Sequence, residues 1–258
     1  MTLAFEPSPK TTIPLFRAFV GGSSSLPAIC SICGLRQVCF PCDLMQEEVH
    51  QAGEMVATDR RVKQGDALFR TGDHFHYLYT VRSGSVKTVQ SLRDGREQVT
   101  GFQMTGDMLG AEAIGSQKHG CDAIAIEESR VCSILFSRIE SLGRARPEMQ
   151  HELRKAMSGE IVRQHDVLLL LGVMTAEERV AIFLLNLSQR LKARGYSPTD
   201  FILRMTRRDI GSYLGMKLET VSRMLSKFRN DGLIDARHKH IHVLDLAGLR
   251  SRIRQSIN

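Results

Sequence analysis

The sequence has few of the features that mark membrane, secreted or catalytic proteins. Its longest apolar run, Val167–Met174, is much shorter than the roughly 20 residues of a membrane-spanning helix. No cluster of Lys or Arg precedes an apolar stretch near the N-terminus, whose Pro, Ser and Gly content predicts a flexible leader and not a signal peptide. No nucleophile–base pair or phosphate-binding loop stands out. We therefore expect a cytoplasmic protein that is not an enzyme and has no membrane partner.

Positive charge, in contrast, is plentiful and is concentrated at one end of the 258-residue chain. The formal net charge is +7, and the segment from Tyr196 onward contains twelve Lys or Arg against six Asp or Glu. This segment therefore carries six of the seven excess positive charges. A basic module of this kind predicts binding to nucleic acid.

Short β-prone runs alternate with glycines between Arg61 and Phe136. Runs such as YLYTVRSG, SVKTVQSL and EQVTGF alternate apolar and polar residues, and the glycines that punctuate the region lie seven to twelve residues apart. The pattern predicts a small antiparallel barrel or jelly roll. Within it, Asp94 and Gly95 predict a hairpin with a type I′ turn.

The pattern becomes helical after Pro147, where apolar residues recur every three or four positions as in a coiled-coil seam. A helix packed on its own barrel is the alternative, but a segment of roughly 25 residues is long for that role. We therefore expect a helix that forms a homodimer. Its seam consists of Leu153, Met157, Ile161, Gln164, Leu168 and Leu171.

A helix-turn-helix is predicted by MTRRDIGSYLGMKLETVSRMLSKFRNDGLI. Thr206 and Asp209 form a capping box that opens one short helix, Gly215 ends it, and a second helix is expected over 218–230. The following segment, GLIDARHKHIHVLD, predicts a β-hairpin wing.

Three residues on one side of the second helix have the chemistry to read base edges. Arg223 can donate two hydrogen bonds to guanine, Glu219 can accept one from cytosine, and Ser222 can bond either base. The alternative is a solvated helix with an internal Glu–Arg pair, which would contribute only about 0.2–0.5 kcal/mol. The surrounding pattern and charge favour double-stranded DNA. Further expected DNA contacts are Thr206, Arg207, Lys217, Thr220 and Lys227.

Four of the six cysteines lie within thirteen residues, in CSICGLRQVCFPC. In a reducing compartment, thiols this close are more often metal ligands than disulfides. Cys30, Cys33, Cys39 and Cys42 could together ligate zinc, or three of them and a distant cysteine could ligate an iron–sulfur cluster. The spacing of the cysteines does not distinguish a zinc site from an iron–sulfur cluster. Cys121 is expected to be a small buried apolar residue.

The order of these parts, together with TRRDIGSYLG and ETVSRML, closely resembles the CRP/FNR regulators. GLRQVC, LFRTGD, YTVRSG, GDMLGAEAIGS, AMSGEI, LLLL and RGYSP are similar to the oxygen-responsive FNR group of that family. The resemblance runs from Cys30 to Val243 and implies an α+β fold. Its implied parts are a leader with the cysteine-rich segment (1–45), a jelly-roll β-barrel of the cyclic-nucleotide-binding type (46–146), a dimerisation helix (147–174) and a winged helix-turn-helix (175–258).

The resemblance also implies an oxygen-sensing regulator of anaerobic gene expression that binds TTGAT-type palindromic DNA as a dimer and contacts RNA polymerase. The implied [4Fe-4S] cluster is held by Cys30, Cys33, Cys39 and Cys132, and Cys42 is a spare thiol. Loss of the cluster in oxygen would free the leader and lower the dimer population. The alternative is a zinc-stabilised or ligand-free DNA-binding regulator, in which Cys42 is the fourth ligand and Cys132 a core residue.

Two departures from related barrels and helices modify this expectation. Relatives that bind a cyclic nucleotide carry a Gly-Glu pair and an Arg-Ser or Arg-Thr pair, and LGAEAIGSQKHGCDAIA has neither. No Arg lies between Arg96 and Arg130, and a phosphodiester buried without a cation is costly, so we expect no cyclic nucleotide.

Lys217 stands where many relatives cap the recognition helix with Ser or Thr. The histidines at 74, 76, 238, 240 and 242 are expected on the surface.

Overall fold

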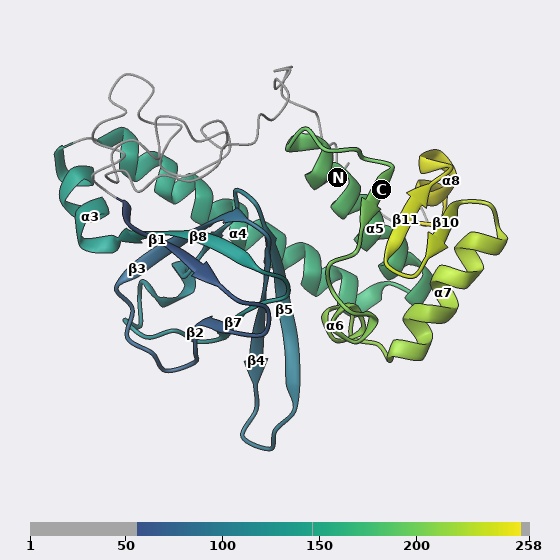
Figure 1. The fold of residues 1–258 in the computed structure, drawn as a ribbon, viewed down its shortest axis with the longest axis horizontal. Coiled ribbons are helices and arrows are strands. Elements are labelled where there is room, and N and C mark those ends of the chain that lie inside the picture. Colours follow the sequence, from purple (N-terminus) through teal and green to yellow (C-terminus); the bar gives the residue numbers. More distant parts are fainter. Residues whose placement is uncertain (1–55, 146, 254–258) are drawn as a thin grey trace. The chain divides into compact units, whose positions relative to one another are not determined.

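The computed structural model of the chain describes residues 56–145 and 147–253 (Figure 1). The leader and the cysteines at 30, 33, 39 and 42 lie outside this range. The described residues form two compact units, and the boundary between them falls inside helix α4 (Pro147–Val173), between Leu168 and Leu169. No helix in the described range is long and apolar enough to cross a membrane.

The first unit contains an antiparallel β-barrel made of two four-stranded sheets, ordered β1-β8-β3-β6 and β2-β7-β4-β5. This confirms the barrel that the glycine spacing predicted. A short 3-10 helix η2 (Ala111–Ala113) and helix α3 (Phe136–Ala145) complete the elements before α4. The strands are β1 Val56–Val62, β2 Ala67–Phe69, β3 Tyr77–Ser83, β4 Ser85–Ser91, β5 Glu97–Met104, β6 Met108–Leu109, β7 Asp122–Ala125 and β8 Ser129–Leu135.

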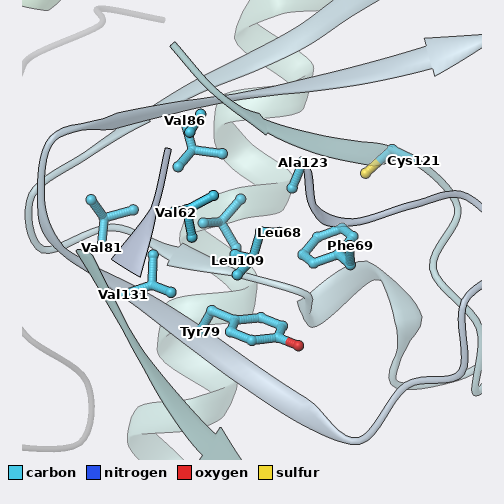
Figure 2. Packing of buried hydrophobic residues seen from close by; sticks show 11 residues of the cluster. Val62, Leu68, Phe69, Tyr79, Val81, Val86, Leu109, Cys121, Ala123 and Val131 are labelled. Atoms are coloured by element: carbon cyan, nitrogen blue, oxygen red, sulfur yellow. The ribbon is translucent and has the colours of Figure 1, made fainter. Parts of the chain in front are cut away.

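Side chains from both sheets fill the inside of the barrel (Figure 2). Val81 of β3 lies opposite Val131 of β8, and both are completely buried in this core. Because successive side chains of a strand point to opposite faces, the next pair along, Thr80 and Cys132, projects from the outer face of the sheet. The pleat of β8 therefore keeps Cys132 out of the barrel core.

The hairpin between β4 and β5 forms where it was predicted, but the type I′ turn was wrong. Of the two central residues of that turn, only Gly95 has a positive φ, at 84°. The amide of Gly95 donates to the carbonyl of Leu92 at 3.0 Å, and the amide of Leu92 donates to the carbonyl of Arg96 at 2.8 Å. This is a longer loop with a left-handed glycine after the turn, a geometry that needs only one positive φ.

The second unit is a winged helix-turn-helix, as predicted. The capping box of Thr206 and Asp209 is present, and the second helix has the predicted bounds. The three-stranded sheet has the order β10-β11-β9, and β10 and β11 form the wing (Figure 1). The elements are α5 Ala176–Ala193, β9 Asp200–Ile202, α6 Arg207–Tyr213, α7 Leu218–Asn230, β10 Ile234–Arg237, β11 His240–Val243 and α8 Leu246–Ser251.

Candidate functional site

The recognition helix α7 has one face in the core of its unit and one face in solvent. Val221, Leu225 and Phe228 are 0–2% exposed, and their spacing of four and three residues places them on one side of the helix. Glu219 and Arg223 are exposed on another side. The packing of the apolar face therefore determines which polar side chains α7 presents to a ligand.

The polar residues near the start of α7 have no partners in the described part of the chain. Glu219, Ser222 and Arg223 make no hydrogen bond or ion pair there, so the alternative of an internal Glu–Arg pair is not realised. Lys217 is the N-cap, and its side chain makes no capping bond, as the sequence predicted. Thr220 is half-buried beside them. These unpaired groups can bond to bases and phosphates without first breaking a contact within the protein.

Lys227, at the other end of α7, does have an intramolecular partner. Its ammonium bonds to the carboxylate of Glu177 at the start of α5. Arg252 bonds to the same carboxylate at 3.2 Å and to Asp231 at 2.9 Å. The bond from Lys227 is the main reason why the pKa of Glu177 lies below its usual value. With 43% of its side chain exposed, Lys227 still has donors for a phosphate, and this role remains a prediction.

Thr206 and Arg207, at the start of α6, form hydrogen bonds within the unit that contains α7. The Thr206 hydroxyl donates to Asp209 at 2.6 Å in the capping box. The Arg207 guanidinium donates to the carbonyl of His238 at 3.3 Å, in the turn of the wing. The sequence did not indicate that Arg207 would connect α6 to the wing, because the two residues are 31 positions apart.

The histidines of the wing are surface residues, as expected. His240 and His242 both bond to the carboxylate of Asp200 on β9, at 2.7 Å and 3.3 Å. The bond with His240 is the largest cause of the lowered pKa of Asp200. His74, His76 and His238 are also exposed.

The predicted dimerisation seam leaves large apolar side chains in solvent. Ile161 is 56% exposed and Leu168 is 67% exposed, and Leu153, Met157 and Leu171 are half-buried. Gln164 lies between the first two and donates to Glu160 at 2.8 Å. An apolar stripe on a long helix is typical of an interface.

Cys132 lies on β8 in register with Asp59 of β1 and Thr80 of β3. The residue is buried, at 9% exposed. Asp59 forms ion pairs with Arg82, at 2.6 Å, and with Arg130. The second carboxylate oxygen of Asp59 is buried and has no hydrogen-bond partner within the described residues. This outer face thus has a thiol and, on the neighbouring strand, a carboxylate with one unsatisfied oxygen.

Cys121 occupies a different environment, inside the barrel core, as predicted (Figure 2). Burial is the largest cause that raises the pKa of its thiol to about 12, and the nearby Glu112 carboxylate adds to the effect. A metal ligand must be a thiolate, so Cys121 is a poor ligand. Cys132 is similarly buried, at 9% exposed against 7% for Cys121, but it lies on the outer face of its sheet. The described residues contain no group of three that could hold a metal, and the other predicted ligands lie outside them.

The residues inside the barrel are relevant to whether the protein binds a cyclic nucleotide. His119 is 3% exposed, its ring stacks on Phe69 with centroids 3.7 Å apart, and its Nδ1 lies 2.9 Å from a Glu112 oxygen. Lys118, the neighbouring cation, is exposed. Aromatic side chains and the buried imidazole of His119, which pairs with the exposed carboxylate of Glu112, therefore occupy this part of the barrel.

Comparison with known proteins agrees with both units. A cyclic nucleotide-binding domain model matches residues 59–145, and a Crp-like helix-turn-helix domain model matches residues 178–252. The chain is 42% identical over 228 residues to the transcriptional regulatory protein btr of Bordetella pertussis, covering 88% of this chain and 94% of that protein. It is 40% identical over 214 residues to the fumarate and nitrate reduction regulatory protein of Escherichia coli K12, covering 83% and 86%.

A solved structure supports the same relationship. FixK2 from Bradyrhizobium japonicum has 32% sequence identity and a TM-score of 0.73, and the match covers 78% of this chain and all of that one. The relatives are regulators, which confirms that the chain is not an enzyme. The α+β architecture predicted from the sequence is also confirmed. The chain belongs to the CRP/FNR superfamily and is an FNR-like transcription regulator with a DNA-binding helix-turn-helix.

Proposed function

We propose that this regulator senses oxygen through a [4Fe-4S] cluster and controls anaerobic gene expression as a homodimer bound to TTGAT-type palindromes, in contact with RNA polymerase. The observation that carries the proposal is the position of Cys132 on the outer face of the sheet, in register with Asp59 of β1 and Thr80 of β3 and not in the barrel core. The similarity to fumarate and nitrate reduction regulatory proteins supports it.

In this proposal Cys30, Cys33, Cys39 and Cys132 hold the cluster. When bound, the cluster supplies an inorganic core that oxygen can degrade. Ligation by both the leader and β8 connects two distant parts of the chain, and loss of the cluster removes this connection. Because metal binding and assembly are linked, the dimer population then falls.

The exposed seam of α4 is the proposed dimer interface. Burial of Ile161 and Leu168 against a second copy removes apolar surface from water. A polar residue in such a seam lowers stability and specifies register. Gln164 therefore keeps the dimer weak enough for a change elsewhere in the chain to control it.

The barrel interior supports a regulator that needs no cyclic nucleotide. The stacked rings of His119 and Phe69 occupy space in the barrel. The described segment between Arg96 and Arg130 provides no guanidinium for a buried phosphodiester.

Replacing Cys132 with Ala tests the ligand assignment. Without a fourth thiolate the cluster is not retained, so anaerobically purified Cys132→Ala should lose the brown absorption and the iron that the wild type shows. Cys121→Ala is the matched control, because it removes another buried thiol and should keep both signals. Loss of iron from Cys42→Ala but not from Cys132→Ala would instead support a site made by the four leader cysteines.

Replacing Arg223 with Ala tests base reading. Because Arg223 has no partner in the described structure, its removal breaks no intramolecular bond there. Binding should weaken by about 1–3 kcal/mol for the site with its guanine and much less for a site with that base changed. Lys217→Ala is the control for a phosphate contact and should weaken all sequences equally. A uniform loss for Arg223→Ala in fluorescence-anisotropy titrations would contradict base reading.

Replacing Gln164 with Leu tests the weak dimer. The change removes a polar group from the seam and should stabilise the dimer by roughly 1–2 kcal/mol. Sedimentation in air should then show dimers for Gln164→Leu and monomers for the wild type. Lys155→Leu adds the same apolar side chain outside the seam and should remain monomeric. A wild type that is already a tight dimer in air would be evidence against control through this seam.

A further inference from the structure

One arginine connects three segments of the second unit. The side chain of Arg179, on α5, donates a hydrogen bond from each of its three guanidinium nitrogens. Nη2 bonds to the carbonyl of Leu171 at 2.8 Å, Nε to that of Met174 at 2.9 Å, and Nη1 to that of Leu214 at 3.0 Å. The acceptors belong to the end of α4, the link between α4 and α5, and the turn of the helix-turn-helix.

These carbonyls are available because two helices end there. The helix α4 ends at Val173, and Leu214 is the C-cap of α6. The last carbonyls of a helix have no intrahelical donor, and a cation near them is favourable. A planar guanidinium with five donors can bond to several acceptors in fixed directions, whereas a Lys ammonium is a point charge on a flexible stem. The geometry thus requires Arg and not merely a positive charge.

Gly215 shows how closely these segments approach one another. Its φ is +63°, and a Cβ built on it would lie 3.0 Å from Cδ2 of Leu171 and 3.4 Å from Nη1 of Arg179. The turn of the helix-turn-helix therefore lies directly against the last turn of α4, at Leu171. Leu171, Arg179 and Gly215 all belong to the same compact unit.

We propose that Arg179 is a positioning residue that fixes the helix-turn-helix on the end of α4. The inference rests on the proposed function, in which a dimer reads two half-sites. Each recognition helix must then enter the major groove at positions about one helical turn, or 34–36 Å, apart. Arg179 makes no expected contact with DNA; it holds the helix-turn-helix against the last residues of α4, the helix that carries the proposed dimer seam.

Simultaneous binding of two half-sites depends on this fixed geometry. Binding of the second half-site is intramolecular and strong when the linkage holds it in place, and the gain is lost when geometry does not match. A rigid dimer is expected to discriminate between half-site spacings, because one added base pair rotates a half-site by about 35°. A dimer whose helix-turn-helix moves on α4 loses this discrimination but still reads each half-site.

The experiment compares Arg179→Lys with Arg194→Lys. Arg194 is a matched control at the end of α5, where its guanidinium bonds to the carbonyl of Arg190 at 2.8 Å. Three TTGAT-type duplexes are used: the palindrome, the palindrome with one base pair added between the half-sites, and a single half-site. All three proteins also carry Gln164→Leu, so that they dimerise in air, and sedimentation checks that they do.

The parent protein and Arg194→Lys should prefer the unaltered palindrome to the lengthened one by about tenfold or more. Arg179→Lys should show less than about threefold preference while binding the single half-site as the parent does. Hydrogen exchange without DNA provides a second measurement, because amides in 171–176 and 212–217 should exchange faster only in Arg179→Lys. Unchanged spacing preference and unchanged exchange would overturn the proposal for Arg179. A parent protein that does not prefer the unaltered palindrome to the lengthened one would contradict the proposed function itself. The hydrogen-exchange measurement would then still test the role of Arg179, because it needs no DNA.

Discussion

The alternation of side chains along β8 is the constraint on which the proposed sensing depends. Val131 points into the barrel and Cys132 points out of it, so one strand stabilises the core and places a buried thiol on the outer face of its sheet. A register shift of one residue would exchange the two side chains. The antiparallel pairing of β8 with both β1 and β3 prevents that shift and fixes the thiol beside Asp59.

In the DNA-binding unit, some polar residues bond to other parts of the unit, and others have side chains available to bind DNA. Thr206, Arg207 and Lys227 bond to other parts of the unit, whereas Glu219, Ser222 and Arg223 have no partner in the described residues. The apolar face of α7 maintains this division, since burial of Phe228 and its neighbours fixes the rotation of the helix. Base readout requires such a fixed orientation, because hydrogen bonds to base edges tolerate little displacement.

Local patterns predicted the elements well, and long-range contacts explain what they missed. The capping box at Thr206 and the bounds of α7 follow from nearby residues, and both were predicted correctly. The Asp94-Gly95 turn was assigned to the wrong type because its dipeptide fits more than one loop. The pairing of Lys227 with Glu177 joins residues 50 positions apart. The three carbonyls bonded by Arg179 come together only in the folded unit, so no local sequence motif predicts these bonds.

Iron content and DNA affinity measured on one sample, before and after exposure to oxygen, test the central claim most directly. The account predicts about four irons per chain in the anaerobic protein. It also predicts that affinity for a TTGAT palindrome falls by about tenfold or more as the iron is lost and the dimer population declines. A colourless protein that holds zinc and binds the palindrome equally well in the presence and absence of oxygen would contradict it.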